Sequence, residues 1–317
     1  MERPRLQRHP DGITAVDTEY MYPGLAAAHV IEHAGRAAFV DTGTTHSVPR
    51  LLAALDELGI ARDAVDYVIL THVHLDHAGG AGRLMQALPQ ARAVIHPRGA
   101  PHMIDPTKLI AGSMAVYGEA KYRQLYGELV PIPAGRVLTT HDGQRLSLAG
   151  RELEFLHTPG HALHHHVIVD LAHRGIFTGD TFGLSYREFD TENGAFIVPT
   201  TTPTQFDPEQ LVASIDRLLS YEPQAMYLTH YSRVTGVLRL AESLKLQIRQ
   251  FVTIARKHRD AANRHEAISG EMRVLWLELL RRHGCTLPDA RIDELLGTDL
   301  ELNTQGLIAW LDRERRS

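Results

Sequence analysis

The sequence predicts an α/β protein with an all-helical C-terminal extension. Up to about residue 230, short apolar runs alternate with turns and helical segments. From about Gly236 onward the strand signals stop, and apolar residues recur at helical spacing. A chain of 317 residues is also longer than one compact core usually needs. We therefore predict a larger α/β domain over residues 1–235 and a smaller helical domain over residues 236–317.

Ten segments are predicted as strands because they are apolar, several are β-branched, and Gly, Pro or Asp bounds them. They are Gly12–Asp17, Ala28–His33, Ala37–Asp41, Val65–Leu70, Ala93–His96, Arg136–Thr140, Glu152–Leu156, Val167–Asp170, Gly175–Thr178 and Ala225–Thr229. The sequence HAGR at 33–36 lies between two of them and is typical of a hairpin turn.

Three helices are predicted between these strands. The first starts near Val48 behind an expected Ser47 cap, and the second starts near Gly80. The third has Asp207 as its cap and Pro at its first position. For the stretch Pro97–Pro133, two interpretations are equally supported: a pair of helices packed on the core, or a lid. The stretch Phe182–Phe206 has no predicted structure.

Composition limits the classes of function. The residues are 44% hydrophobic and 22% charged, and the formal net charge is −5. This balance argues against global disorder and against nucleic acid as a partner, because nucleic-acid-binding proteins usually have a basic face. The lone cysteine, Cys285, and the lack of a signal peptide or long apolar run predict a cytoplasmic protein that does not bind membranes. We expect a small-molecule substrate; a homo-oligomer remains open.

The strongest motif is THVHLDHAGG at 71–80, which follows the apolar segment VDYVIL. It places His72, His74, Asp76 and His77 in a tight turn beyond a strand. Imidazole nitrogens and a carboxylate suit zinc, iron or manganese, and a short loop lets several ligands converge. The sequence therefore predicts a transition-metal site in this loop.

Three further motifs follow predicted strands. They are TPGHALHHH at 158–166, FTGD at 177–180 and YLTH at 227–230. Loops at strand ends are where such scaffolds usually place their chemistry. His and Asp residues thus follow four strands, which favours one shared site.

With these motifs the sequence resembles the metallo-β-lactamase fold superfamily over roughly residues 12–232. The resemblance implies an αββα sandwich and makes residues 1–235 the catalytic domain. It also implies two divalent metal ions, with zinc the first expectation and iron or manganese the alternatives. The implied ligands are His72, His74 and His161 for the first metal, Asp76, His77 and His230 for the second, and Asp180 as the bridge.

The resemblance assigns supporting roles as well. Asp41 in VDTG matches a residue that orients a ligand histidine, although an Asp before Gly is also common in simple turns. His165 matches a histidine near the metals that does not bind them. His164 stands where the family pattern has Gly, so we expect an altered backbone there. His96, His141, His157 and His173 have no convergent partner in the sequence, and His166 is expected to be structural.

The expected chemistry is hydrolysis of a small ester, thioester or lactone by a hydroxide bridging two metals, with Asp76 accepting the proton. The bridging Asp180 disfavours β-lactams, because the true β-lactamases lack it, and favours relatives such as glyoxalase II and lactonases. No clear basic cluster matches glutathione. Phe182, Tyr186 and Arg187 follow Asp180, and we expect them to contact substrate, with Arg187 pairing a carboxylate.

Three alternatives remain open. A persulfide dioxygenase would hold a single iron with His72, His161 and Asp180. A ribonuclease Z-like phosphodiesterase is disfavoured by the acidic balance. A binding protein with a dead site is disfavoured because every expected ligand is present.

Overall fold

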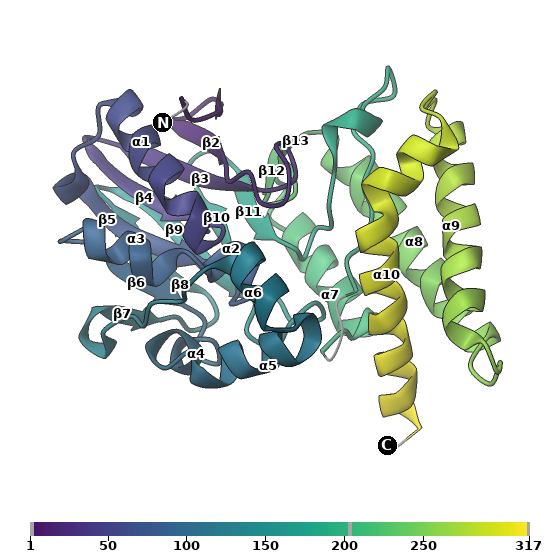
Figure 1. Cartoon of the computed structure of the whole chain (residues 1–317). Coiled ribbons are helices and arrows are strands. Elements are labelled where there is room, and N and C mark those ends of the chain that lie inside the picture. Colours follow the sequence, from purple (N-terminus) through teal and green to yellow (C-terminus); the bar gives the residue numbers. More distant parts are fainter. Residues whose placement is uncertain (1–2, 202–204, 316–317) are drawn as a thin grey trace. The chain divides into compact units, whose positions relative to one another are not determined.

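The structure is a computed structural model that describes residues 3–201 and 205–315; residues 202–204 of the unassigned stretch Phe182–Phe206 lie outside the described residues. It contains two β-sheets flanked by helices and a C-terminal helical region (Figure 1). The predicted α/β sandwich with a helical extension is therefore confirmed.

The chain divides into two compact units. The first comprises residues up to His157, His164–Gly179 and Ala225–Arg233, and the second comprises Thr158–Leu163, Asp180–Gln224 and Val234 onward. The second unit thus joins the helical extension with two segments from earlier in the chain. The proposed domain boundary between residues 235 and 236 stays a prediction.

Both sheets belong to the first unit, except for Val234 at the end of the last strand. The seven-stranded sheet has the order β1 (Leu6–Arg8), β2 (Ile13–Asp17), β3 (Ala27–His33), β4 (Arg36–Val40), β5 (Val65–Leu70), β6 (Arg92–Ile95) and β7 (Val137–Thr139). The six-stranded sheet has the order β13 (Ser232–Val234), β12 (Ala225–Leu228), β11 (Gly175–Gly179), β10 (His166–Asp170), β9 (Arg151–His157) and β8 (Gln144–Leu148). All ten predicted strands are present, whereas β1, β8 and β13 were not predicted.

The core of the first unit has two layers, because the seven-stranded sheet is buried on both faces. In β4, Ala38 and Val40 pack toward the other sheet with Phe155 and Phe177, whereas Phe39 packs on the opposite face. On that face lie α1 (Val48–Leu58) and α3 (Ala81–Ala87). Successive side chains of a strand point to opposite faces of the sheet, so alternate residues of β4 belong to two different core layers.

The helices of the first unit also include α2 (Leu75–Ala78), α4 (Ala100–Ile104), α5 (Thr107–Tyr117) and α6 (Glu119–Tyr126). The stretch Pro97–Pro133 therefore contains α4, α5 and α6, one helix more than the expected pair, and the alternative that it serves as a lid stays a prediction. Tyr122 and Tyr126 of α6 are buried with Leu75. This apolar cluster supports the short helix that contains Asp76.

The N-terminus of α1 differs from the prediction. Ser47 makes no side-chain cap bond; its hydroxyl instead donates to the Thr18 carbonyl at 3.0 Å. The predicted start of α3 after Gly80 and the predicted Asp207 cap are confirmed. Gly59 ends α1 in the left-handed conformation, at φ 71°, and Asp207 caps α7 (Pro208–Leu219) by accepting from the Gln210 amide.

The second unit contains α7 and the three helices of the extension, α8 (Val237–Lys257), α9 (Arg264–Arg282) and α10 (Asp289–Glu314). α8 packs against α7, α9 and α10. Its apolar face buries Leu240, Leu244 and Phe251, and Phe251 meets Trp276 of α9 edge-on at 5.5 Å between ring centroids.

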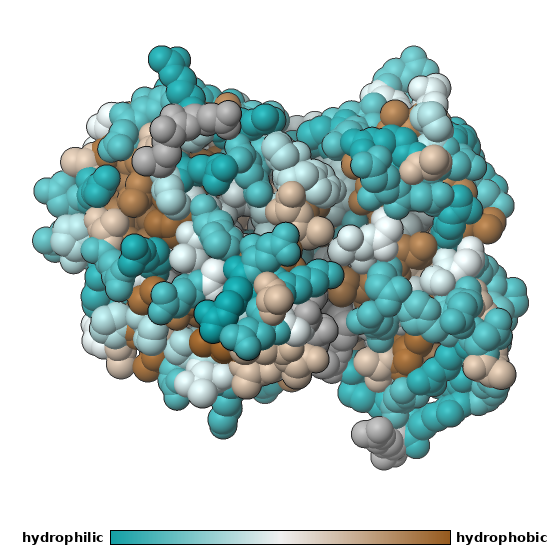
Figure 2. All heavy atoms as spheres, in the orientation of Figure 1, coloured by the Kyte–Doolittle hydropathy of each residue, from teal (hydrophilic) through white to brown (hydrophobic). Residues whose placement is uncertain are grey.

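Figure 2 shows a mostly hydrophilic surface with small hydrophobic patches. Among the described helices, none has the length and apolar character to cross a membrane.

Candidate metal centre

The site lies at strand ends that the topology brings together. β4 and β5 are parallel neighbours in one sheet, and β11 and β12 are parallel neighbours in the other. Carboxyl ends of parallel strands meet at one edge of a sheet. Within the first unit, Asp41 follows β4, the His72 loop follows β5 and His230 follows β12.

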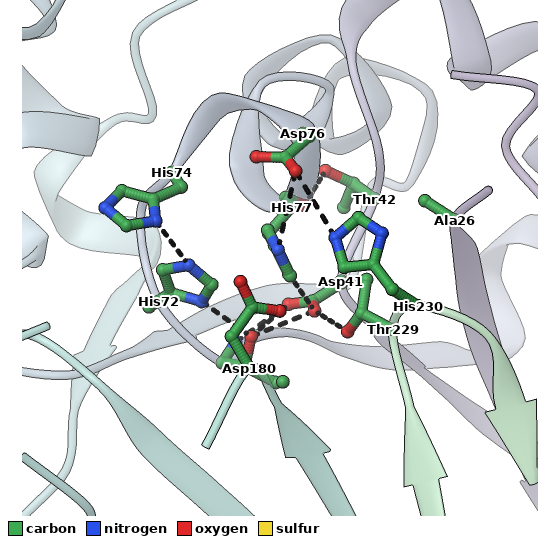
Figure 3. Close-up of polar contacts among 12 residues, drawn as sticks. Ala26, Asp41, Thr42, His72, His74, Asp76, His77, Asp180, Thr229 and His230 are labelled. Carbon is green, nitrogen blue, oxygen red and sulfur yellow. Dashed lines mark hydrogen bonds and ion pairs between the residues drawn. The ribbon is translucent and has the colours of Figure 1, made fainter. Parts of the chain in front are cut away.

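The loop after β5 brings His72 and His74 together. His72 Nε2 lies 2.8 Å from His74 Nδ1, and the ring centroids are 4.4 Å apart (Figure 3). The His72 side chain is fully buried, and its Nδ1 lies 3.2 Å from the Thr71 hydroxyl. Two imidazole nitrogens at this separation present the convergent donors that a transition metal needs.

Asp76, His77 and His230 form a second group. One ligand atom from each lies within 4.8 Å of the others. The Asp76 carboxylate is 3.7 Å from His77 Nε2 and 3.4 Å from His230 Nε2 (Figure 3). Asp76 and His77 lie in the four-residue helix α2 rather than in the expected simple turn. Gly79 follows it, where a Cβ would lie 2.4 Å from the Leu75 carbonyl oxygen, so the HAGG sequence permits this close return of the chain.

Asp41 holds the ring of His77. Its carboxylate accepts from His77 Nδ1 at 2.8 Å, from the Thr71 amide at 2.8 Å and from the Thr229 hydroxyl at 2.8 Å (Figure 3). Because a carboxylate only accepts, Nδ1 of His77 bears the proton and Nε2 is the ligand atom. Asp41 has a φ of 59°, a strained conformation that these bonds stabilise.

His230 is oriented by the backbone. Its Nδ1 donates to the Leu25 carbonyl at 2.9 Å, so its Nε2 is the atom that faces Asp76. Sequence reasoning did not identify Thr71, Thr229 or the Leu25 carbonyl as partners in the site. The repeated Thr-His pairs in THVH and YLTH were the available signal for the two threonines.

His161 and Asp180 belong to the second unit. His161 Nε2 lies 3.4 Å from the Asp180 carboxylate, and both side chains are buried. Nδ1 of His161 lies 3.4 Å from the Thr200 carbonyl oxygen. Gly160 before it has a φ of 125°, and a Cβ there would lie 2.3 Å from the Leu211 amide nitrogen of α7. Only glycine therefore allows the TPGH turn to approach α7 so closely.

His164 and His165 lie beside the His72 loop. The His165 ring stacks on His72 at 4.8 Å between centroids, and His164 meets His74 edge-on at 5.5 Å. His164 is absent from the described non-glycine residues that have a positive φ, so histidine fits its backbone here without strain; an alteration relative to the family pattern stays a prediction. A position with an ordinary φ accepts histidine as readily as glycine.

A second histidine cluster was missed by sequence reasoning. The rings of His96 and His157 lie 4.1 Å apart, and those of His96 and His166 lie 6.1 Å apart. The expectation that His96 and His157 lack a convergent partner is therefore wrong. Burial lowers the pKa of both His96 and His166 to about 3, so both rings are neutral near pH 7. The Thr140 hydroxyl lies 2.9 Å from His166 Nδ1, so the buried His166 ring has a polar partner.

The three residues expected to contact substrate lie in the second unit. Phe182 is fully buried, and the Tyr186 hydroxyl donates to Asp299 of α10 at 2.9 Å. The Arg187 guanidinium donates to the Ser185 carbonyl at 2.7 Å and lies 3.3 Å from the Asp190 carboxylate. A substrate carboxylate would have to compete with Asp190 for Arg187. Contact of these residues with substrate stays a prediction.

Comparison with known proteins gives consistent matches. The family model described as "Metallo-beta-lactamase superfamily" matches residues 21–230. A metallo-beta-lactamase fold-containing protein of Sulfurisphaera tokodaii is 27% identical over 229 residues, covering 71% of this chain and 79% of that protein. The hydroxyacylglutathione hydrolase of Aeromonas hydrophila is 27% identical over 217 residues, covering 68% of this chain and 65% of that enzyme.

Solved structures share the fold. An archaeal metallo-beta-lactamase superfamily protein from Sulfolobus tokodaii has a TM-score of 0.61 at 24% identity, covering 76% of this chain and 87% of that one. A metallo-beta-lactamase family protein from Thermus thermophilus has a TM-score of 0.66 at 21% identity, covering 96% of this chain and 94% of that one. The second match extends through most of the helical region.

Proposed function

Because the chain belongs to the metallo-beta-lactamase superfamily, we propose that it is a dinuclear metal-dependent hydrolase that cleaves a small ester, thioester or lactone. The observation that supports this most directly is the group of Asp76, His77 and His230. Each of its two imidazoles has Nδ1 occupied by an acceptor and Nε2 turned toward Asp76. Such preorientation is typical of metal ligands, whereas a merely structural histidine does not need it.

The proposed ligand sets follow from the donor chemistry. His72, His74 and His161 would hold the first metal and Asp76, His77 and His230 the second, with Asp180 as the bridge. The group of Asp76, His77 and His230, which lies within the first unit, supports the second ligand set. Mixed imidazole and carboxylate donors suit zinc first, and iron or manganese as well. When bound, two such ions supply activated water near neutral pH and polarise a carbonyl oxygen.

The chain's own residues would then position and move protons. Asp76 is partly exposed, with 23% of its side chain accessible, so its carboxylate can accept a proton from water or from substrate. Asp41 and the Leu25 carbonyl keep the two ligand imidazoles in a single tautomer. The proposed mechanism thus uses Asp76 as the base and His77 and His230 as oriented ligands, and it requires no nucleophile from the protein.

Glutathione is disfavoured as the recognised group. Several basic residues of α8 and its C-terminal end already face carboxylates, as in the pairs Lys245–Asp216, Lys257–Glu271 and Arg259–Glu314. A substrate carboxylate would have to displace these partners, and the Lys245 side chain is only 12% exposed. We therefore propose a substrate recognised by its ester, thioester or lactone group rather than through glutathione carboxylates.

A hydrolysis screen run beside elemental analysis tests the proposal. We expect close to two transition-metal ions per chain, turnover of thioesters or lactones, and little turnover of β-lactams or phosphodiesters. A chelator should abolish the activity, and added metal should restore it. A single iron in fully loaded protein would favour a persulfide dioxygenase instead, and phosphodiester turnover alone would contradict the proposed substrate class.

A substitution at Asp41 tests its role in orienting His77. Asp41→Ala should weaken metal binding by about 10–100-fold, because the residue that fixes a ligand tautomer is lost. The measurement is the metal dissociation constant from competition with a chelating dye. Asp170→Asn is a matched control, since Asp170 is equally buried but pairs with Arg151 in β9. That control should lower stability and leave metal affinity unchanged; equal affinities in all three proteins would contradict the role of Asp41.

A further inference from the structure

The C-terminal helices hold the chain segment between Asp180 and α7 through buried hydrogen bonds. Gln247 of α8 donates from its side-chain nitrogen to the Ile197 carbonyl at 2.8 Å and accepts from the Trp276 indole at 3.1 Å. Gln247 is fully buried. A buried amide with both ends satisfied holds its partners in place, because an unpaired polar group in the interior is energetically unfavourable.

Asn303 of α10 binds the same segment on both sides of Thr200. Its side-chain oxygen accepts from the Thr201 amide at 2.7 Å and from the Thr201 hydroxyl at 2.7 Å. Its side-chain nitrogen donates to the Pro199 carbonyl at 3.2 Å and to the Asp299 carbonyl at 2.8 Å. Asn303 is only 2% exposed, and these four bonds use the full capacity of its amide. The chain on both sides of Thr200 is therefore clamped to α10.

One peptide plane connects this clamp to a proposed metal ligand. The Thr200 carbonyl and the Thr201 amide belong to the same peptide group, in which the C=O and N–H bonds point in opposite directions. The amide faces Asn303, and the carbonyl oxygen lies 3.4 Å from His161 Nδ1. A hydrogen bond of this length is weak and contributes little to the orientation of the carbonyl. The peptide plane is therefore oriented mainly by the shorter bond between the Thr201 amide and Asn303.

We infer that Asn303 is a positioning residue for His161, acting through the Thr200–Thr201 peptide. The inference rests on the proposed function, in which His161 binds the first metal. A ligand histidine needs an acceptor on its second nitrogen, and the Thr200 carbonyl is that acceptor. The helical extension thereby takes part in building the metal centre, although it supplies none of the proposed ligands.

Metal binding by Asn303→Ala tests this inference. Loss of the amide frees the peptide plane, so we expect the first-site dissociation constant to rise about tenfold. The visible spectrum of the cobalt-substituted protein should change too, because it reports ligand geometry at the ion. Thr304→Val is the matched control. Thr304 is buried one residue further along α10, and its hydroxyl donates to the Leu300 carbonyl of its own helix. It should bind cobalt with wild-type affinity and spectrum.

A second variant covers the case in which Asn303→Ala does not fold. Thr201→Val removes the hydroxyl contact to Asn303 but keeps the backbone amide bond, so it should weaken cobalt binding by a smaller factor. Wild-type affinity and spectrum in a folded Asn303→Ala protein, or in Thr201→Val when the first variant is unfolded, would overturn the inference. Cobalt binding needs no substrate, so absence of hydrolysis in the wild-type protein would refute the proposed function and leave this comparison intact.

Discussion

Replacing Asp180 with alanine is expected to lower kcat by about a thousandfold or more and to release metal from the second position first. Loss of a residue that only orients a ligand costs about 10–100-fold, and a direct ligand shared by two ions should cost more. The buried Asp180 carboxylate already lies 3.4 Å from His161 Nε2, so the substitution also removes the neighbour of another proposed ligand. Steady-state kinetics with a thioester or lactone and elemental analysis of the same preparation measure both effects.

Asp216→Ala provides the comparison for Asp180. Asp216 lies on α7, is largely exposed and pairs with Lys245. Its removal should leave both kcat and metal content unchanged, because Asp216 is none of the proposed ligands and its partner Lys245 also pairs with Glu242. Turnover of Asp180→Ala close to that of the wild-type enzyme would refute the dinuclear mechanism.

Deleting the chain after Gly236 is expected to give insoluble or aggregating protein rather than a smaller active enzyme. The deletion removes the partners of buried side chains, and each large apolar group that loses its burial costs about 1.5–3 kcal/mol. It also removes Gln247 and Asn303, which hold the carbonyls of Ile197 and Pro199. The soluble fraction after expression and the melting temperature of any soluble product measure the effect.

Two point substitutions on α8 separate this packing effect from simple shortening. Leu244→Asp places a charge at a fully buried position and should reproduce the loss of solubility. Leu238→Asp changes the same residue type at a position that is 71% exposed, and it should leave solubility and melting temperature unchanged. A soluble and fully active truncated protein would show that the extension is an independent unit.

The strands that sequence patterns missed share one physical property. β1, β13 and β8 are edge strands, and β1 and β8 expose alternate or successive side chains to solvent. An edge strand buries little apolar surface, so its hydrophobic pattern is weak. By contrast, β4 and β5 lie inside the sheet, and their continuous apolar runs predicted them directly.

By itself, the sequence determined the class of fold and the residues proposed as metal ligands. Both depend on local patterns, since a strand, its following turn and its His or Asp residues are adjacent in the chain, as in the run from Val65 to His77. The family resemblance already implied that Asp41 orients a ligand histidine, but only the tertiary structure showed the other groups that orient the ligands and their supports. Asp41 meets Thr229 across 188 residues of chain, and Asn303 meets Thr201 across 102. Such bonds depend on how distant elements pack. The residues next to an asparagine or threonine in the sequence do not indicate which distant group its side chain will bind.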